Sequence, residues 1–558
     1  MTSSPDDATT RPKHTDEFDL PRECDVCIIG TGLTQSILAA ACAKRGRNVL
    51  HLDASTSYGG AFGAFKPSCD PGKLFESDES LTETTHRHHA IFGACVDATT
   101  GRVIPERLSR LRSDADAASS AAPTRGYSID LNAPRLVLGA DAFCESIVRS
   151  GAHRYLEFKA VERTFVYMDG CARAVASNRS DVFKDATLSG AEKRALMRFL
   201  KLVHSAAMSD EVARRRSGKN GEETNVAVGA PGSEWGGNEI VEEDGLRAEK
   251  GERMDAFLTR HGLSEKLKAA VMYALALQTR ADCDAVKALE ALKVYISSVA
   301  KYGPQTGACL IPLYGVGDIP QAFCRVGAVE GATFILRQGM KGITPNADAV
   351  TSMTSVGGQD VRVKHVVAPA PPGRATGTLA HAVCILDSPL VSSHDQVFVV
   401  FPPHSVRAEQ KSVVRALQIG SHTGCCPDGR YLLYLSNLVD DGCDEDPFVN
   451  LNAVLDIVAK RGDEDESKSS VFGAEEERRP TILWGTTYTQ ACCNEPVVEC
   501  ASPNVILCPA PDDAATFNGT LRTAEMAYSK LFGDEELFEE EIQHSPGVND
   551  DDDANMDL

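Results

Sequence analysis

The residues most suggestive of chemistry form a glycine turn near the start of the chain, Gly30-Thr31-Gly32-Leu33-Thr34. It follows an apolar segment that contains Val26, Ile28 and Ile29. In a dinucleotide-binding turn the first glycine permits a tight bend, the second lets the backbone approach a pyrophosphate, and a third allows the next helix to pack on the strand. The chemistry indicated by such a turn is binding of a flavin or a nicotinamide cofactor.

The third glycine is replaced by Gln35. A long side chain there presses on the contact between helix and strand, or points into the space for the phosphates. Asp53 ends the next apolar segment, where such folds hold a ribose hydroxyl. We therefore predict that Gly30, Gly32, Gln35 and Asp53 form a degenerate turn and that the chain uses no cofactor. A flavin-dependent oxidoreductase that tolerates Gln35 is the remote alternative.

Other signals for catalysis or metal binding are weak. The sequence contains no Gly-x-Ser-x-Gly elbow, no His-Glu-x-x-His pair and no phosphate-binding loop, so we predict no catalytic residue. Cys24-x-x-Cys27 lies in an expected strand without a second pair at zinc spacing, which favours core cysteines over a metal or redox site. His86-Arg-His88-His89 lies in a polar segment and is interpreted as surface histidine. We predict no metal.

Composition narrows the class of protein. The 558 residues carry 57 Lys and Arg against 79 Asp and Glu, a net charge of −22. This charge argues against nucleic-acid binding, which needs a basic face. It is interpreted as a solvated surface, and the alternative is that it steers basic partners. The 18 cysteines are scattered, and we find neither an apolar leader nor an apolar stretch of about 20 residues. We expect a cytoplasmic protein with free thiols.

The elements around the turn follow from apolar spacing. Strand, helix and strand are expected over residues 23–53, which is a βαβ opening. A later helix begins with the capping-box pattern Ser189-x-x-Glu192 and continues with apolar residues at helical spacing. Strands return after residue 300. The pattern predicts an α/β chain with an inserted helical block.

Domain boundaries are expected where the composition of the chain changes. Residues 1–20 are polar and expected to be disordered. The α/β domain is discontinuous, 21–139 and 301–533, with an insertion over 66–124. The helical domain is expected over 140–300, with a flexible insertion over 208–253. Residues 534–558 contain eleven acidic residues and no Lys or Arg, and are expected to be a disordered tail.

Longer stretches carry a resemblance. The segment "CDVCIIGTGLTQSILAAACAKRGRNVLHLDASTSYGG", together with "YSIDLNAPRLVLG", "RYLEFKAVERTFVY" and "IPLYGVGDIPQAFCRVGAVEGATFILR", resembles the Rab GDP-dissociation inhibitor and Rab escort protein superfamily. The resemblance implies a fold like that of flavin monooxygenases, an FAD/NAD(P)-binding-like α/β domain with a smaller all-helical domain inserted. It also implies that no flavin is used.

The resemblance further implies partners and sites. The larger domain would bind GDP-bound Rab GTPases through Tyr58, Gly59, Gly60, Asp318, Arg325, Thr333 and Ile335. The helical domain would hold the geranylgeranyl lipid of prenylated Rab and dock the α/β heterodimer of Rab geranylgeranyltransferase through Tyr295, with transient membrane contact. Alternatives stay open: Asp318 and Arg325 could form an internal ion pair, and Tyr58 or Tyr295 could be core tyrosines.

The chain departs from the family pattern in two places and resembles one branch more than the other. Ser57 replaces the first of two tyrosines, and Asp318 replaces a glutamate. The insertions and "FCRVGAV" resemble escort proteins, which present newly made Rab to the transferase as a non-catalytic component A. A recycling inhibitor that extracts prenylated Rab is the alternative.

Overall fold

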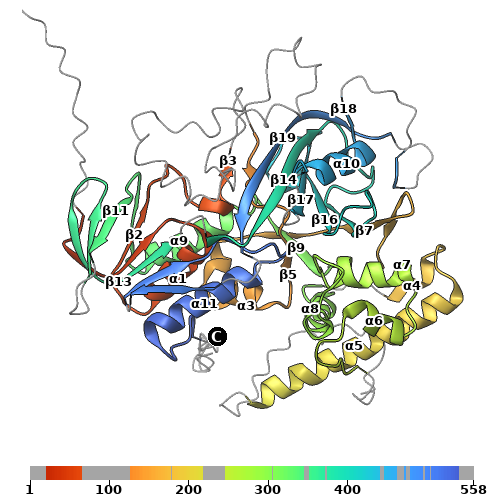
Figure 1. Cartoon of the computed structure of the whole chain (residues 1–558), viewed down its shortest axis with the longest axis horizontal. Coiled ribbons are helices and arrows are strands. Elements are labelled where there is room, and N and C mark those ends of the chain that lie inside the picture. Colours follow the sequence, from red (N-terminus) through yellow and green to blue (C-terminus); the bar gives the residue numbers. More distant parts are fainter. Residues whose placement is uncertain are drawn as a thin grey trace, which may run out of the picture.

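The computed structural model describes residues 20–65, 126–176, 179–217, 246–303, 306–344, 351–370, 374–439, 445–461, 470–472, 478–493, 497–502 and 504–539. The histidine cluster at 86–89, the N-terminus before residue 20 and nearly all of the 66–124 insertion lie outside these ranges. Figure 1 shows two large sheets, with a group of helices beside the second.

The first sheet holds the glycine turn. Its parallel core runs in the order β10 (Thr333–Leu336), β2 (Val49–Asp53), β1 (Glu23–Ile29), β13 (Asp360–Pro369) and β21 (Val505–Cys508). The antiparallel strands β12 (Thr351–Ser355), β11 (Met340–Thr344) and β20 (Glu499–Ser502) extend it. In this register Ile28 lies between His51 and Val367.

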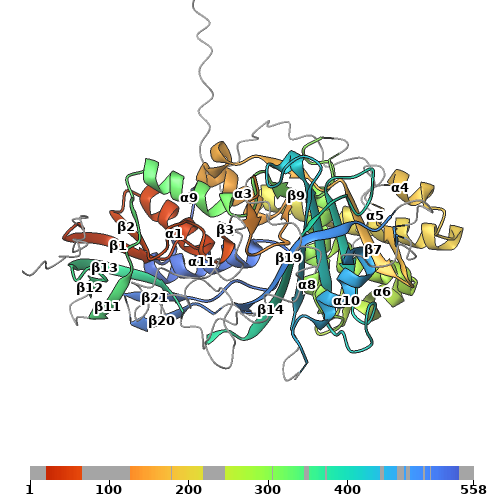
Figure 2. The same ribbon diagram turned by 90° about the horizontal axis from the view of Figure 1, so that it is seen from above.

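The expected βαβ opening is present as β1, α1 (Leu33–Lys44) and β2. Helix α1 is buried from Leu33 to Ala43 because its small alanines permit close packing on every side. It contacts α9 (Asp318–Val329) and α11 (Asn518–Phe532), and α3 (Ala142–Ser150) packs in the same core. Figure 2 shows α9 beside α1, on the outer side of this helical layer.

The second sheet is mixed, in the order β18 (Lys460–Arg461), β19 (Thr481–Cys492), β14 (Gly377–Leu386), β17 (Tyr431–Leu438), β16 (Val414–Gly420), β15 (Val397–Phe401), β7 (Arg163–Met168) and β8 (Cys171–Ala174). Helix α10 (Val449–Val458) packs on one face. Apolar side chains of the other face, such as Phe398 and Leu417, share a core with the helical group.

Two small sheets lie between the two large sheets (Figure 1). Strands β3 (Ala64–Phe65) and β4 (Ile129–Asp130) form one, and β5 (Val137–Leu138), β9 (Cys309–Pro312) and β6 (Phe158–Ala160) form the other. Short 3-10 turns occur at η1 (Gly60–Phe62), η7 (Ala152–Tyr155) and η12 (Ser421–Thr423). The strand β3 directly follows the loop that carries Tyr58, so this junction fixes that loop.

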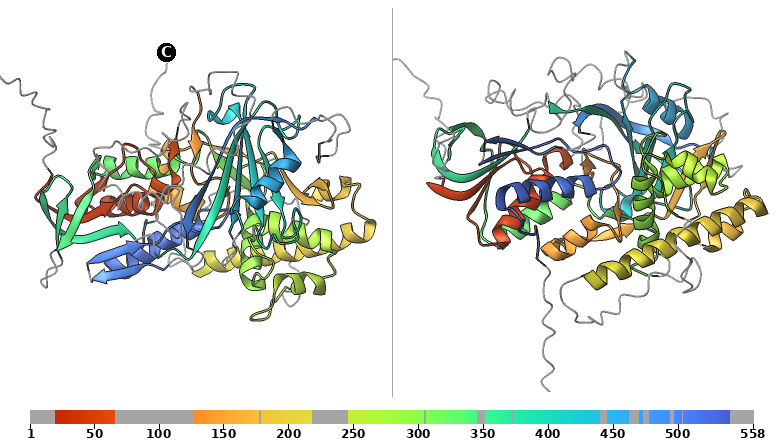
Figure 3. Two further views of the ribbon diagram at one scale, coloured as in Figure 1. Left: turned by 45° about the horizontal axis from the view of Figure 1, so that its top comes forward. Right: turned by 60° about the horizontal axis from the view of Figure 1, so that its bottom comes forward.

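The helical group contains α4 (Arg179–Lys184), α5 (Gly190–Ser217), α6 (Met254–Arg260), α7 (Glu265–Ala269), the π-helical segment η10 (Ala270–Leu275) and α8 (Ala285–Ser298). The capping box at the start of α5 is confirmed. The Ser189 N–H donates to the Glu192 carboxylate at 2.9 Å, and the Glu192 N–H donates to the Ser189 hydroxyl at 3.2 Å. Figure 3 shows α5 running along the edge of the molecule.

The structure corrects three sequence-based boundaries. The helical segment does not begin at residue 140, because α3 joins the first core and β6–β8 pair with other strands. The 208–253 insertion is shorter, since α5 reaches Ser217 and Leu246 is buried. The acidic tail does not begin at 534, because Leu537 and Phe538 are buried against the first core.

Candidate functional site

The glycine turn is closed by contacts within the chain. Both the N–H and the hydroxyl of Thr31 donate to Oδ2 of Asp53, at 2.7 and 2.6 Å. The other oxygen of Asp53 accepts the N–H of Ser55 at 2.8 Å. The carboxylate that would hold a ribose in a nucleotide site therefore ties the turn to the end of β2.

The loop after β2 packs directly on this turn. The Gly59 N–H donates to the Thr31 hydroxyl at 3.0 Å, and Gly59 forms a bridge with Gly32. Gly59 has a φ of 108°, and a β-carbon there would lie 2.7 Å from the Cα of Gly63. A β-carbon on Gly60 would lie 3.2 Å from the Cα of Gly32. The two glycines thus allow the close approach that places Tyr58.

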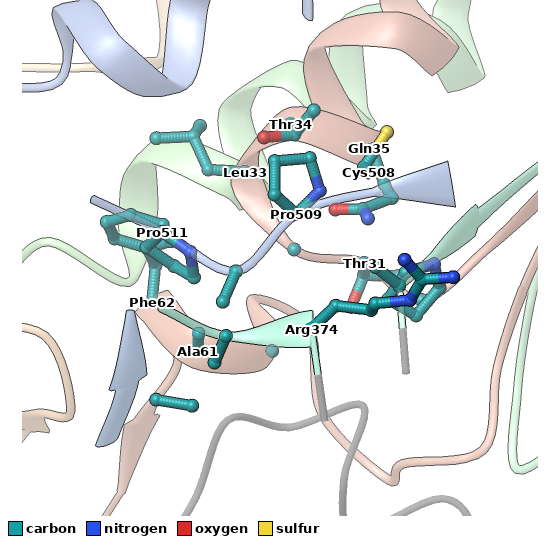
Figure 4. Close-up of a pocket in the computed structure, with 18 of the residues that line it drawn as sticks. Thr31, Leu33, Thr34, Gln35, Ala61, Phe62, Arg374, Cys508, Pro509 and Pro511 are labelled. Carbon is teal, nitrogen blue, oxygen red and sulfur yellow. The ribbon is translucent and has the colours of Figure 1, made fainter. Parts of the chain in front are cut away.

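The space left for a cofactor does not fit one. The cavity beside the turn has a volume of about 70 Å³, whereas cofactor sites have roughly 300–1,000 Å³. The amide oxygen of Gln35 lies 2.7 Å from where a β-carbon of Gly32 would be, so it covers the backbone that would approach a pyrophosphate. Figure 4 shows Gln35, Pro509, Pro511 and Phe62 around this cavity. These residues do not form a flavin or nicotinamide cradle.

Helix α9 presents a polar stripe near this loop. Asp318 and Arg325 are seven residues apart, so they lie on the same helix face, about 10 Å apart along the axis. The described residues record no ion pair between them, and the spacing explains why. Gln321 lies between them, exposed, and its Nε2 donates to the Gly317 carbonyl at 3.0 Å. The internal ion pair considered above is therefore not formed.

Sequence reasoning missed two exposed residues on this face of α9, one polar and one apolar. Gln321 and Val329 continue the same helical spacing, and the Val329 side chain is 70% exposed. Their neighbours Ile319, Phe323 and Val326 are buried against α1 and the first core. The helical period of α9 was the signal that could have found both residues.

The two charged residues of α9 lie in different environments. Asp318 is half-buried, and this burial raises the pKa of its carboxyl. Arg325 is exposed, and its guanidinium lies 4.7 Å from the centre of the Tyr155 ring. Such a cation–π contact holds the guanidinium in place while its N–H groups remain available. Tyr155 is another residue that the sequence did not indicate.

Tyr58 lies between a core and a surface position. Its ring packs edge-on against Phe334 of β10, with the ring centres 6.4 Å apart. The residue is partly exposed, and burial is the main cause that raises the pKa of its phenol. A partly supported tyrosine with one accessible edge is suited to anchor a partner protein.

Thr333 and Ile335 lie on the other face of the first sheet. Strand alternation places Phe334 on the helix-covered face, in contact with Tyr58, and Ile335 on the face with Leu50 and Leu52. Thr333 and Ile335 therefore do not lie on the face of the sheet that meets Tyr58, and their part in binding Rab stays a prediction. Their position on the edge strand β10 leaves only Thr333 exposed.

Tyr295 is a core residue in this structure. Its side chain is 3% exposed and packs with Leu292 and Ile296 in the core of the helical group. Burial raises the pKa of its phenol far above the usual range. The expectation that Tyr295 docks a partner is not supported, because a docking side chain must be accessible. Phe183 of α4 is an exposed aromatic side chain among the described residues of this group, at 58%.

Among the residues that the structure describes, the Cys24-x-x-Cys27 pair does not form a metal or redox site. Cys24 and Cys27 are buried, and burial raises the pKa of the Cys24 thiol to about 12, which disfavours the reactive thiolate. Within the described residues no three His, Cys, Asp or Glu side chains are placed to hold a metal ion. No helix there is long and apolar enough to cross a bilayer.

Comparisons with known proteins find relatives along most of the chain. A family model described as "GDP dissociation inhibitor" matches residues 97–216 and 233–477. A protein of Arabidopsis thaliana named Rab escort protein 1 is 28% identical, covering 95% of this chain and 96% of its own length. A Drosophila melanogaster protein named Rab proteins geranylgeranyltransferase component A is 27% identical, covering 78% and 77%.

The solved structures extend the likeness to the fold. The crystal structure of a Rab GDI from Plasmodium falciparum aligns with a TM-score of 0.60 and 17% identity, covering 92% of this chain and 98% of that one. Together with the parallel sheet and its glycine turn, this confirms the predicted α/β fold class. Because the family model matches more than half of the sequence, the chain belongs to the GDP dissociation inhibitor family.

Proposed function

We propose that this chain is a Rab escort protein. It binds newly made, GDP-bound Rab GTPases and presents them to Rab geranylgeranyltransferase for prenylation of their C-terminal cysteines. It then carries the prenylated Rab to membranes. The transferase makes the thioether bonds, and this chain contributes binding only, as a component A.

The observation that carries the proposal is the match along nearly the whole of both chains to a protein named Rab escort protein 1. Several other relatives are named as component A of the geranylgeranyltransferase. The closed glycine turn supports a binding role, because Gln35 and the Tyr58 loop leave about 70 Å³ where a cofactor would lie.

The side chains of α9 and of the neighbouring Tyr58 loop are suited to binding a GTPase. The carboxylate of Asp318 and the guanidinium of Arg325 can pair with polar side chains of a GTPase, and Tyr58 adds an aromatic anchor. In the helical group, Phe199, Leu200 and Val203 form an apolar interior. Burial of a C20 lipid in such an interior gains roughly 0.8 kcal/mol per CH₂ group, so a pocket for the lipid would be energetically worthwhile.

A reconstituted prenylation reaction tests the proposal. Purified transferase catalytic subunits, an unprenylated GDP-bound Rab and labelled geranylgeranyl diphosphate are combined with and without this chain. We expect lipid transfer only when the chain is present, rising to saturation at a molar ratio near one to Rab. Transfer equal to the control without the chain would refute the escort function.

The second candidate is a recycling GDP dissociation inhibitor. It is favoured by a relative of Schizosaccharomyces pombe named as a probable secretory pathway GDP dissociation inhibitor, 25% identical over 75% of this chain. Extraction of prenylated Rab from vesicles separates the two. A recycling inhibitor extracts Rab and does not support the transferase, whereas an escort protein supports the transferase.

A further inference from the structure

The buried carboxylate of Asp130 joins the two segments that carry the predicted Rab surface. We propose that Asp130 is a positioning residue: it holds the turn that begins α9 against the loop that carries Tyr58. This assignment rests on the proposed function, because it concerns the surface through which Rab is bound. Asp130 lies far in sequence from both segments and in neither of them.

The carboxylate contacts the turn directly. Asp130 is 2% exposed, and its two oxygens accept the N–H groups of Val316 at 2.9 Å and Gly317 at 3.1 Å. Gly315 has a φ of 99°, and a β-carbon there would lie 2.7 Å from the carboxylate. The turn therefore needs a glycine for this approach. Asp318, the first residue of α9, follows at once.

The backbone of Asp130 contacts the other segment. In the sheet of β3 and β4, Asp130 pairs with Ala64, and the Leu131 N–H donates to the Gly63 carbonyl at 3.0 Å. A β-carbon on Gly317 would lie 3.0 Å from the β-carbon of Ala64. The loop that ends in β3 and the turn that begins α9 are thus in contact. Asp130 accepts hydrogen bonds from the turn and is paired across the small sheet with the end of the loop.

The Asp130 carboxyl is expected to gain or lose its proton near neutral pH. The pKa of its carboxyl is raised to about 7: burial is the main cause, the two N–H donors act against it, and the nearby charge of Asp318 adds a smaller upward contribution. The other titratable groups that face it are Tyr434, whose hydroxyl accepts the Asp130 N–H at 3.3 Å, and Cys425. A protonated carboxyl loses its charge and accepts the two N–H groups more weakly, so the turn is held less firmly.

The test compares Asp130→Asn with a matched variant, Asp141→Asn. Asp141 is also 2% exposed and accepts two N–H groups, from Cys144 at 2.7 Å and Leu138 at 3.2 Å, but it caps α3. Binding of GDP-loaded Rab is measured by calorimetry from pH 6 to 8. We expect Asp130→Asn to weaken binding about tenfold at pH 8 and Asp141→Asn to leave the dissociation constant unchanged.

The pH profile separates positioning from a general loss of stability. The ratio of the Asp130→Asn and wild-type dissociation constants should fall towards one near pH 6, where wild-type Asp130 is itself protonated. Titration of the Rab cancels in this ratio. A ratio that stays constant with pH, or an equal loss of affinity in Asp141→Asn, would overturn the assignment.

A measurement on the wild-type chain does not depend on either variant folding. Hydrogen exchange should show lower protection of the Val316 and Gly317 amides at pH 6 than at pH 8, after correction for intrinsic exchange rates. Equal protection at both values would overturn the assignment. If the wild-type chain binds no GDP-loaded Rab at any pH, the proposed function fails instead, which is a separate result.

Discussion

Asp53 and Gln35 define the glycine turn through their side chains. Asp53 occupies the position of a ribose-binding residue, but Thr31 and Ser55 supply its hydrogen bonds. The Gln35 amide covers Gly32. Because both groups are satisfied or enclosed by this chain, a nucleotide would have to break several short hydrogen bonds to enter.

Arg325 supplies the clearest prediction for one side chain. We expect Arg325→Ala to weaken binding of GDP-loaded Rab by about 1–3 kcal/mol, the cost of losing a charged hydrogen-bonding anchor. Calorimetry measures the change. Arg362→Ala is the control, because the Arg362 side chain is 70% exposed on β13 and pairs with Glu23. Equal affinities for wild type and Arg325→Ala would remove this residue from the Rab surface.

His51 predicts a pH dependence of stability. It is fully buried, its Nε2 lies 2.6 Å from the Gly30 carbonyl oxygen, and burial lowers its pKa from 6.5 to about 4. Between these values the unfolded chain binds a proton that the folded chain does not, so stability falls as the pH falls.

Denaturant unfolding of wild type and His51→Gln at pH 7 and pH 4.5 measures this effect. The wild-type chain should lose about 2–3 kcal/mol more than the variant over that interval. The buried carboxyls of Asp130 and Asp141, with raised pKa values, act in the opposite direction in both proteins and cancel in the comparison. Parallel profiles would show that folding does not lower the pKa of His51.

At the scale of elements, the sequence predicted those helices and strands whose contacts are made by residues close together in the chain. The βαβ opening and the capping box of α5 were predictable because the partners lie within a few residues or in adjacent segments. The start of the helical group was not, because β7 pairs with β15, more than 200 residues later. Arg135 likewise pairs with Asp512 at 2.6 Å, which no short pattern reveals.

The candidate site was also only partly predictable, because some of its contacts join segments that are distant in sequence. The family resemblance implied that Tyr58, Asp318 and Arg325 share one surface, but the sequence did not show which face of β10 meets Tyr58. That depends on strand register, which placed Phe334 there. For α8, an amphipathic stripe with Tyr295 was visible, but only the packing of α5 against α8 shows that this stripe is buried.

We predict that the transferase docks on helix α4, through the exposed ring of Phe183. The Lys193 ammonium group donates to the Phe183 carbonyl at 2.8 Å, and the Arg179 guanidinium lies 5.6 Å from the Phe183 ring centre, so the exposed ring is supported. Under the proposed function we expect Phe183→Ala to raise the transferase concentration needed for half-maximal prenylation about tenfold or more, with unchanged Rab binding.

Two further variants serve as controls for Phe183→Ala. Tyr295→Ala removes a buried ring and should lower the free energy of unfolding by about 3–5 kcal/mol. Val286→Ala, at an exposed apolar position of α8, should change neither property. A normal transferase requirement in Phe183→Ala would contradict docking through α4.

At the scale of the whole molecule, the C-terminal segment 534–539 joins elements that lie far apart in sequence. Glu535 pairs with Arg47 at 2.6 Å, and Glu536 pairs with Arg149 at 2.8 Å. Between the acids, Leu537 and Phe538 are buried, and the Phe538 ring stacks on Phe323 of α9. The composition of this segment indicated a solvated tail, because two apolar residues among many acids are a weak signal.

Burial and charge make different contributions to this contact. Exposed ion pairs contribute about 0–1 kcal/mol each and are screened by salt, whereas burial of a Leu or Phe side chain contributes about 1.5–3 kcal/mol. The free energy of unfolding of a chain that ends at Gly533 should therefore be about 2–5 kcal/mol lower than that of a chain that ends at Glu539. This difference should be the same in low and in high salt. Phe538→Ala should reproduce most of this loss, and Glu535→Gln little of it. A loss that disappears in high salt would show that the arginine pairs hold the segment, and that its apolar residues do not.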